Sequence, residues 1–266
     1  MRIICCLKYI VKKFYNRLKF NQITPSHLLK AWLTSTLPCL LCAANTAPKA
    51  RLGFTHTPIC ADCIAALPWY TAARCPQCAL PNAAGALCGR CLQHPPAFDR
   101  TFAPFRYAYP LDRLLHQFKY HQQLFISPLL TDSLITQWPQ HEDANQAAVL
   151  LAMPMHINRL RQRGFNHALL LAKQLQRHWA MPLDLEGCTR IVDTQTQAGM
   201  DMRTRVRNLR GAFTTAKQWH GKHVVVVDDV MTTGASMHAV ANVLKQAGAE
   251  RVTALVLART LKDTVD

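Results

Sequence analysis

Apolar residues in the second half of the chain form short uninterrupted runs, which alternate with stretches of helical spacing. The runs at 148–153 (AVLLAM), 223–227 and 251–258 (RVTALVLA) have the length and composition of buried strands. Residues 164–180 and 234–247 carry apolar side chains at helical spacing. Strands without polar alternation, separated by helices, predict an α/β fold with a parallel sheet covered on both faces.

The pattern changes towards the N-terminus. Residues 98–109 are rich in aromatics and predict strands, whereas 111–120 (LDRLLHQFKY) and 127–138 predict helices. Residues 39–91 have little periodicity and contain turns with Pro, Ala and Gly, so this segment cannot build much hydrophobic core of its own. Residues 1–20 again show helical spacing of apolar side chains.

The charge narrows the range of partners. The chain carries 31 Lys plus Arg against 15 Asp plus Glu, a formal charge of +16, which favours nucleic acid, phosphorylated metabolites or an anionic membrane surface. Residues 1–20 contain six basic residues and no acid, the pattern of an amphipathic helix lying on a membrane surface. The alternatives are a helix that packs on the rest of the protein or an upstream extension without a role. No apolar stretch reaches the roughly 18 residues of a membrane span.

Eight of the eleven cysteines form four CxxC pairs. Disulfide scaffolds are usually short secreted chains, and no signal peptide with a cleavage site is present, so we expect a reduced cytoplasmic protein that binds metal through thiolates. Two such turns complete one tetrahedral site, and eight thiolates bind two structural zinc ions. Sequential pairing is the simplest arrangement, with an interleaved one as the alternative; the ligands are Cys39, Cys42, Cys60, Cys63, Cys75, Cys78, Cys88 and Cys91. Cys188 reads as an ordinary small residue.

The stretch 224–236 (VVVVDDVMTTGAS) carries the strongest functional pattern. Asp228 and Asp229 follow a buried strand, and in open α/β sheets ligands bind outside the carboxyl ends of the strands. Neighbouring carboxylates repel each other, so they require a shared partner such as a ribose cis-diol or a diol-bound Mg²⁺. The residues that open the next helix can bind a phosphate through backbone N–H groups and hydroxyls; they are Thr232, Thr233, Gly234, Ala235 and Ser236.

This stretch resembles the phosphoribosyl diphosphate (PRPP) motif of type I phosphoribosyltransferases, which implies that the acids bind the ribose hydroxyls and the loop binds the 5′-phosphate. With the CxxC pairs and further matching pieces, the chain over residues 37–260 looks like the ComF family of competence-associated proteins. That family pairs a double zinc ribbon with a phosphoribosyltransferase domain. The matching pieces are Pro154, His156, Arg161, Arg163, Gly164, Phe165, Asn166, Thr194, Gln197, Arg205, Asn208, Gly211, Ala212 and Phe213.

Arginines near the motif suit a pyrophosphate. Arg161 and Arg163 precede the turn at Gly164, where guanidinium groups and a helix N-terminus could share one anion. Four further arginines at 203–210 lie where phosphoribosyltransferases often have a mobile loop. The alternative for all of them is a solvated surface or contact with DNA phosphate. The resemblance also includes a departure, because purine-salvage members carry an acid, a plausible general base, where this chain has Thr232.

The resemblance implies three segments: a basic extension at 1–36, a double zinc ribbon at 37–95 and a phosphoribosyltransferase-like domain at 96–266. The extension departs from the usual family start near the first CxxC, as a misassigned start codon would. Two functions of different class follow. One is binding of PRPP with Mg²⁺, with transfer of phosphoribose if Asp228, Asp229 and Arg163 are catalytic. The other is a non-catalytic module of the DNA-uptake machinery that binds single-stranded DNA, with a helicase partner.

Overall fold

The computed structural model describes residues 39–44, 59–121, 123–138, 148–193, 209 and 211–261. The predicted helix in 1–20 and the whole segment 1–36 lie outside these residues. The four arginines at 203–210 lie outside them as well, as do Thr194, Gln197 and Asn208. Within the described part of the chain, no helix is long and apolar enough to cross a membrane.

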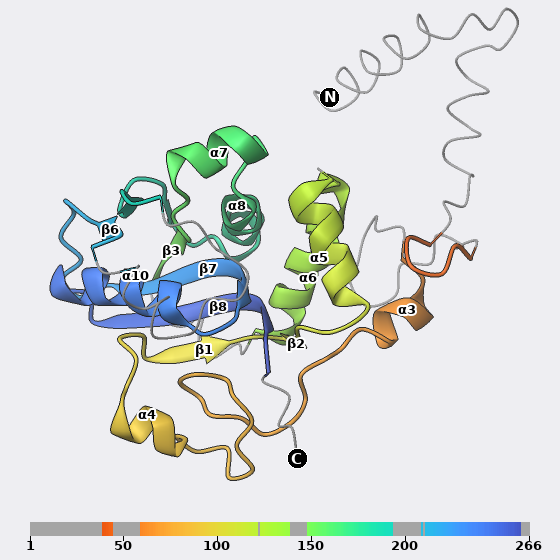
Figure 1. Ribbon diagram of the computed structural model, residues 1–266, viewed down its shortest axis with the longest axis horizontal. Coiled ribbons are helices and arrows are strands. Elements are labelled where there is room, and N and C mark those ends of the chain that lie inside the picture. Colours follow the sequence, from red (N-terminus) through yellow and green to blue (C-terminus); the bar gives the residue numbers. More distant parts are fainter. Residues whose placement is uncertain are drawn as a thin grey trace, which may run out of the picture.

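The centre of the fold is a parallel sheet with strand order β1-β8-β7-β3-β4 (Figure 1). Every pair along this order is parallel, and β2 also pairs in parallel with β8. This confirms the predicted α/β class. The strands are β1 (Arg100–Phe102), β2 (Phe105–Arg106), β3 (Ala148–Ala152), β4 (Leu183–Asp184), β7 (His223–Met231) and β8 (Arg251–Arg259).

Helices cover both faces of this sheet, because successive side chains of a strand point to opposite sides. Val225 and Val227 of β7 pack in the core with the first set of helices, whereas Val224 and Val226 pack in the core with the last helix. All four valines are fully buried, and each contributes about 1.5–3 kcal/mol of hydrophobic stabilisation. The first set is α5 (Leu111–Tyr120), α6 (Ser127–Gln137) and α8 (His167–Trp179), and the last helix is α10 (Ala235–Gln246) (Figure 1).

One local expectation was wrong, and one helix was not expected. The strand at 223–227 continues to Met231, because β8 keeps its register alongside and pairs Met231 with Arg259. The helix expected at 164–180 is present as α8. A helix that was not expected, α7 (Ile157–Arg163), precedes it and ends at Gly164, whose φ of 78° is the left-handed conformation that glycine adopts most readily. The side chain of Asn166 then accepts two backbone N–H groups of the first turn of α8.

The cysteine-rich segment adds two short helices, α3 (Ala61–Ala65) and α4 (Gly89–Gln93), on different sides of the sheet (Figure 1). Ile64 of α3 joins the same core cluster as Phe105 of β2, and the Trp69 ring lies 4.4 Å from the Phe105 ring. The cysteine-rich segment therefore packs its apolar side chains against the core of the sheet domain, as its lack of periodicity predicts. A final antiparallel pair, β5 (Thr189–Arg190) with β6 (Phe213–Thr214), lies beside the main sheet.

Candidate functional site

The eight paired cysteines form two clusters, and the clusters follow the sequential pairing. In each cluster the sulfur atoms all lie within 4.8 Å of one another. The sulfur atoms of Cys42 and Cys60 are 3.7 Å apart, as are those of Cys78 and Cys88. A tetrahedral zinc ion with Zn–S bonds of about 2.3 Å has edges of roughly 3.8 Å, so both clusters fit zinc. The members are Cys39, Cys42, Cys60 and Cys63 in the first cluster and Cys75, Cys78, Cys88 and Cys91 in the second.

Backbone amides favour thiolates in both clusters. Burial opposes ionisation of Cys39, but N–H donors from the surrounding backbone, including Cys60, outweigh it and lower the pKa to about 6. Burial likewise opposes ionisation of Cys75, but backbone N–H donors, including that of Cys88, outweigh it and lower the pKa to about 7. Thiolate is the form that binds zinc. Four protein thiolates fill a tetrahedral ion, so the zinc that these residues would hold is structural.

The predicted phosphate loop lies between β7 and α10. Gly234 has a φ of 80° and is the N-cap residue of α10, so the chain turns sharply and leaves the first N–H groups of the helix at the loop. The Thr233 hydroxyl accepts the N–H of Ala235 at 3.3 Å, while the Thr232 side chain is exposed. A Cβ atom on Gly234 would lie 3.3 Å from the Met231 sulfur, so the residue is constrained by space as well as by conformation.

The two acids have different surroundings. Asp229 is 6% exposed, and its Oδ2 atom lies 2.9 Å from Lys119 Nζ of α5 and 3.2 Å from His167 Nε2 of α8. Its other oxygen accepts the Val230 N–H. Asp228 is partly exposed, and its Oδ1 accepts the Asp229 N–H at 2.9 Å. The expected pair of equivalent carboxylates is therefore one carboxylate in an ion pair and one beside it that is more accessible.

These surroundings separate the pKa values. Burial, followed by the neighbouring Asp229 charge, raises the pKa of Asp228 to about 7. Burial also acts on Asp229, but the neighbouring Lys119 charge, with a smaller contribution from His167, outweighs it and lowers the pKa of Asp229. Burial lowers the pKa of His167 to about 4, with Asp229 opposing and Lys119 and Arg163 adding to the shift. Near neutral pH, Asp229 is therefore a carboxylate paired with Lys119, the Asp228 carboxyl is partly protonated, and the His167 imidazole is neutral.

Arg163 and Arg161 have separate positions on α7. One guanidinium nitrogen of Arg163 lies 2.9 Å from His167 Nε2, and the other donates to the Tyr120 hydroxyl at 3.3 Å. Arg163 therefore joins the network around Asp229. Arg161 is exposed, and Gly164 ends α7 instead of opening a helix. The N–H groups that open the next helix, α8, are those of Ala168 and Leu169, and the Asn166 side chain accepts both.

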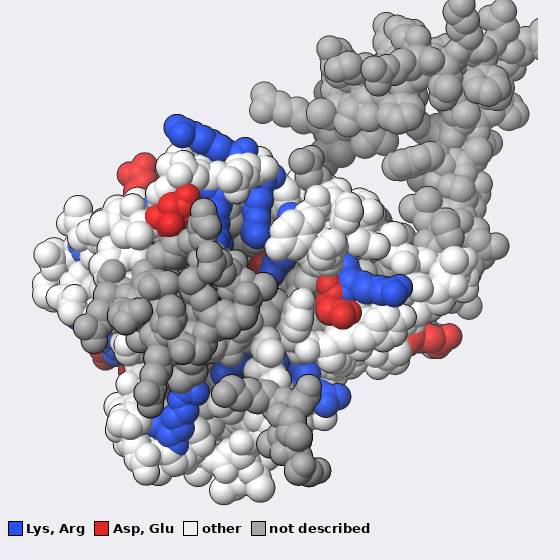
Figure 2. Space-filling view, viewed as in Figure 1, with Lys and Arg blue, Asp and Glu red and all other residues white. Residues whose placement is uncertain are grey.

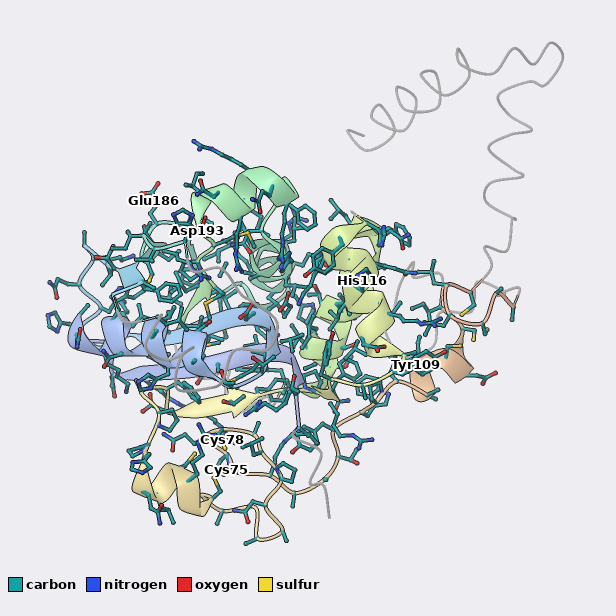
Figure 3. All side chains as sticks on the ribbon, viewed as in Figure 1. Cys75, Cys78, Tyr109, His116, Glu186 and Asp193 are labelled. Atoms are coloured by element: carbon teal, nitrogen blue, oxygen red, sulfur yellow. The ribbon has the colours of Figure 1, made fainter. Side chains whose placement is uncertain are left out.

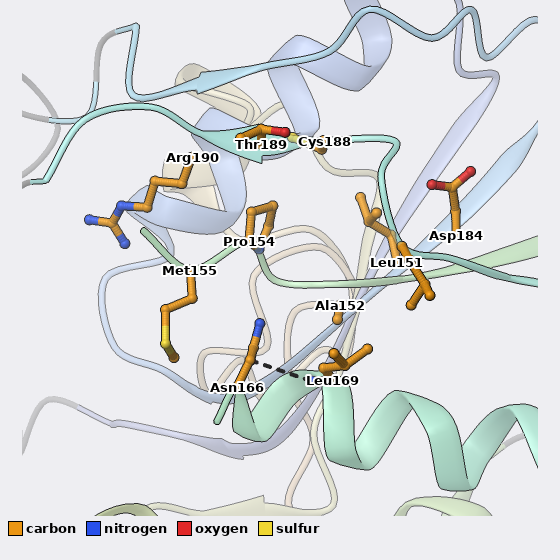
Figure 4. A pocket seen from close by; sticks show the side chains of 11 residues that line it. Leu151, Ala152, Pro154, Met155, Asn166, Leu169, Asp184, Cys188, Thr189 and Arg190 are labelled. Carbon is orange, nitrogen blue, oxygen red and sulfur yellow. Dashed lines mark hydrogen bonds between the residues drawn. The ribbon is translucent and has the colours of Figure 1, made fainter. Parts of the chain in front are cut away.

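A cavity of about 200 Å³ opens at the carboxyl ends of β3 and β4 (Figure 4). Both apolar and polar residues line it. Ala152 on its wall pairs with Val227, the residue before Asp228. Burial raises the pKa of the Cys188 thiol in this wall to about 11, which keeps it protonated. The polar lining residues are Asn166, Asp184, Thr189 and Arg190.

Lys119 and His167 were missed by the sequence reasoning. Lys119 lies about a hundred residues before the motif, in a stretch that reads only as an amphipathic helix. His167 directly follows the Gly-Phe-Asn piece and gives no separate signal. Their roles depend on the sheet order, which brings the end of α5 and the start of α8 to the end of β7.

Comparison with known proteins gives matches over both parts of the chain. Residues 163–266 match the family described as phosphoribosyl transferase domain, and residues 31–92 match the double zinc ribbon domain. The DNA utilization protein YhgH of Salmonella typhimurium is 35% identical over 228 residues, covering 84% of this chain and 97% of that protein. Competence protein F of Haemophilus influenzae is 30% identical over 178 residues, covering 65% and 78%. Competence protein ComFC of Bacillus subtilis is 26% identical over 237 residues, covering 84% and 95%.

The two matched families follow one another along this chain in the order of the cysteine clusters and the parallel sheet. The identity with the Salmonella protein extends over nearly its whole length, so the similarity is not confined to one motif. The chain belongs to the ComF family, which joins a double zinc ribbon to a phosphoribosyltransferase domain.

Proposed function

We propose that this protein binds a ribose phosphate such as PRPP at the end of β7. The observation that carries the proposal is the direct succession, within nine residues, of Asp228 and Asp229 and a helix-opening loop with a left-handed glycine. The acids accept the ribose hydroxyls, and the N–H groups and hydroxyls of residues 232–236 bind the 5′-phosphate. Arg161 and Arg163 supply positive charge for a pyrophosphate on the same ligand.

Ligand entry changes the environment of Asp229. A ribose hydroxyl or a diol-bound Mg²⁺ competes with the Lys119 ammonium for the Asp229 carboxylate, which is 2.9 Å away in this structure. Two carboxylates are a suitable donor set for Mg²⁺. We therefore expect Mg²⁺ to enter together with PRPP, and a titration repeated without Mg²⁺ measures its contribution.

Binding is the core of the proposal, and transfer of phosphoribose is its extension. Displacement of pyrophosphate proceeds through an oxocarbenium-like state, and positive charge beside the departing pyrophosphate stabilises the negative charge that develops on it. Arg163 and a bound Mg²⁺ would supply that charge, and Asp228 and Asp229 would hold the ribose. Thr232 cannot act as a general base, so an acceptor would have to arrive already deprotonated or bring its own base.

Calorimetric titration of the full chain with PRPP and Mg²⁺ tests the proposal. We expect a single site, and we expect the double substitution Asp228→Asn/Asp229→Asn to weaken binding by about ten- to hundredfold, the equivalent of losing one hydrogen bond to a charged group. Lys217→Met is the matched control, because this lysine pairs with Asp184, away from the loop. Wild-type protein that gives no binding heat would contradict the proposal.

A second candidate is binding of single-stranded DNA, which the charge of +16 and the names of the relatives favour. On the face shown in Figure 2, Lys and Arg side chains outnumber acids but gather in several separate groups. We propose that such a module acts in the cytoplasm, at the inner membrane if residues 1–20 contact it, beside a DNA-uptake helicase. Single-stranded DNA affinity across a salt series tests this, since each neutralised phosphate contributes a slope of about −0.7 in log K against log salt. Affinity independent of salt would contradict it.

A further inference from the structure

Arg259, the last residue of β8, is 3% exposed although it always carries a positive charge. A buried cation is costly unless its donors are satisfied. The Arg259 guanidinium donates to backbone carbonyls: Nε to Cys78 at 2.9 Å, and Nη1 to Met231 and Thr260 at 2.9 Å each. Nη1 also donates to the carbonyl of Thr232.

These acceptors belong to two different parts of the protein. Cys78 is a ligand of the second cysteine cluster, and Met231 and Thr232 lead directly into the phosphate loop. Arg259 lies beside Met231 because β7 and β8 pair these two residues. The buried Arg259 side chain thus joins a turn of the second cysteine cluster to Thr232, the first residue of the phosphate loop.

A second connection runs in parallel. Gln77, between two ligands of the same cluster, donates from Nε2 to the Phe98 carbonyl at 3.0 Å. The Phe98 ring lies 3.7 Å from the position that a Cβ on Gly234 would occupy. The N–H of Ala97 donates to His238 Nδ1 in the first turn of α10, also at 3.0 Å. The loop is therefore supported from the cluster at its beginning and at its end.

In the described part of the chain, the first cluster lies in a different place. Cys39 belongs to the core cluster that contains Phe105 and the helices α5, α6 and α8, on the α3 side of the molecule. Figure 3 shows Cys75 and Cys78 of the second cluster on the other side, between α4 and β1. The two cysteine clusters are alike in chemistry but differ in what they support.

We propose that Arg259 is a positioning residue that fixes the phosphate loop to the second cysteine cluster, so that the loop keeps its ligand-binding geometry only while that cluster is closed by its metal. The inference rests on the proposed ribose-phosphate site for its consequence in binding. Its structural content, the coupling of loop and cluster, is measurable without any ligand.

The first test substitutes Arg259 by Met and by Lys and follows amide hydrogen exchange of the peptide covering 231–238. Lysine keeps the charge but cannot donate to Cys78 and Thr232 together, so we expect exchange to quicken by about tenfold or more in both variants, with Arg259→Lys the milder. Arg74→Met is the matched control. The Arg74 guanidinium lies in the same module, donates to the Ala103 carbonyl at 2.7 Å and stacks on Tyr70, without contact to the loop.

The second test opens one cluster at a time. Cys88→Ser removes a ligand of the second cluster, and Cys42→Ser removes a ligand of the first. We expect Cys88→Ser to quicken exchange in 231–238 and Cys42→Ser to leave it unchanged, with each variant retaining one zinc per chain by metal analysis. If Arg259→Met does not accumulate as a folded protein, Arg259→Lys and this cysteine pair decide the question.

Titration with PRPP completes the set. The coupling predicts affinity at least tenfold lower in Arg259→Lys and Cys88→Ser than in Arg74→Met and Cys42→Ser. Loop exchange that is the same in Arg259→Lys as in wild type, or that responds equally to Cys42→Ser and Cys88→Ser, would overturn the inference. Wild-type protein that binds no PRPP would overturn the ribose-phosphate proposal alone, because the exchange comparison still decides the coupling.

Discussion

Substitution of Lys119 by methionine tests the acid pair as the structure describes it. The ammonium lies 2.9 Å from Asp229 Oδ2, and the two side chains are 19% and 8% exposed. At an effective dielectric constant of about 20, two unit charges at this distance attract by roughly 6 kcal/mol. Returning the ammonium to water offsets part of this, and the His167 ring, 3.2 Å away, keeps a polar contact with the carboxylate. We therefore expect Lys119→Met to lower the free energy of unfolding by about 3 kcal/mol.

Urea unfolding at pH 7.5 measures this loss, with Lys217→Met as the matched control. Lys217 also pairs with an aspartate, Asp184, but its side chain is 52% exposed, so we expect a loss of no more than about 1 kcal/mol. The difference depends on pH in a defined direction. Because the pKa of Asp229 is lowered in the folded protein, the pair stabilises above the unfolded pKa of about 3.9, and this contribution disappears as the pH falls through the folded pKa. Equal losses for Lys119→Met and Lys217→Met would refute the reasoning.

Three further predictions concern the same site and the clusters. Burial raises the pKa of Asp228 to about 7, so ionisation of this carboxyl lowers the stability of the folded protein as the pH rises from about 4 to 7. Asp228→Asn should therefore stabilise the protein at pH 8 and change its stability little at pH 4, as measured by urea unfolding. Gly234→Ala should lower the thermal midpoint more than Gly164→Ala, since both have positive φ but only Gly234 has neighbours within 4 Å of an added Cβ, and equal shifts would count against this. Metal analysis should find two zinc ions per chain, with four thiols becoming reactive per zinc released; a single zinc would be inconsistent with two closed clusters.

The sequence predicted those features that depend on local patterns. The β-branched run of β7 and the alternation of strands and helices predicted the parallel sheet, and it is present. The spacing of the CxxC pairs predicted two clusters, and both are present; it left sequential and interleaved pairing open, and the structure has the sequential one. In each case the physical cause is short in range: side-chain period in strands and helices, and the bite of two thiolates in one turn.

The features that were not predicted depend on contacts between distant segments. Lys119 reaches Asp229 because α5 lies across the end of β7, and Arg259 reaches Cys78 across 181 positions of sequence. Neither residue type signals such a partner by its neighbours in the chain. The end of β7 was placed too early for a related reason, since the strand continues through Asp228 as long as β8 continues to pair with it. Local polarity suggested an end that the sheet does not have.

A structure of the full chain with bound ribose 5-phosphate tests the central claim most directly. The account predicts the phosphate within hydrogen-bond reach of the N–H groups of residues 233–236, the ribose hydroxyls on Asp228, and Lys119 Nζ moved away from the 2.9 Å contact with Asp229. Ligand bound elsewhere at saturating concentration, with the loop empty and the Lys119–Asp229 contact unchanged, would contradict it.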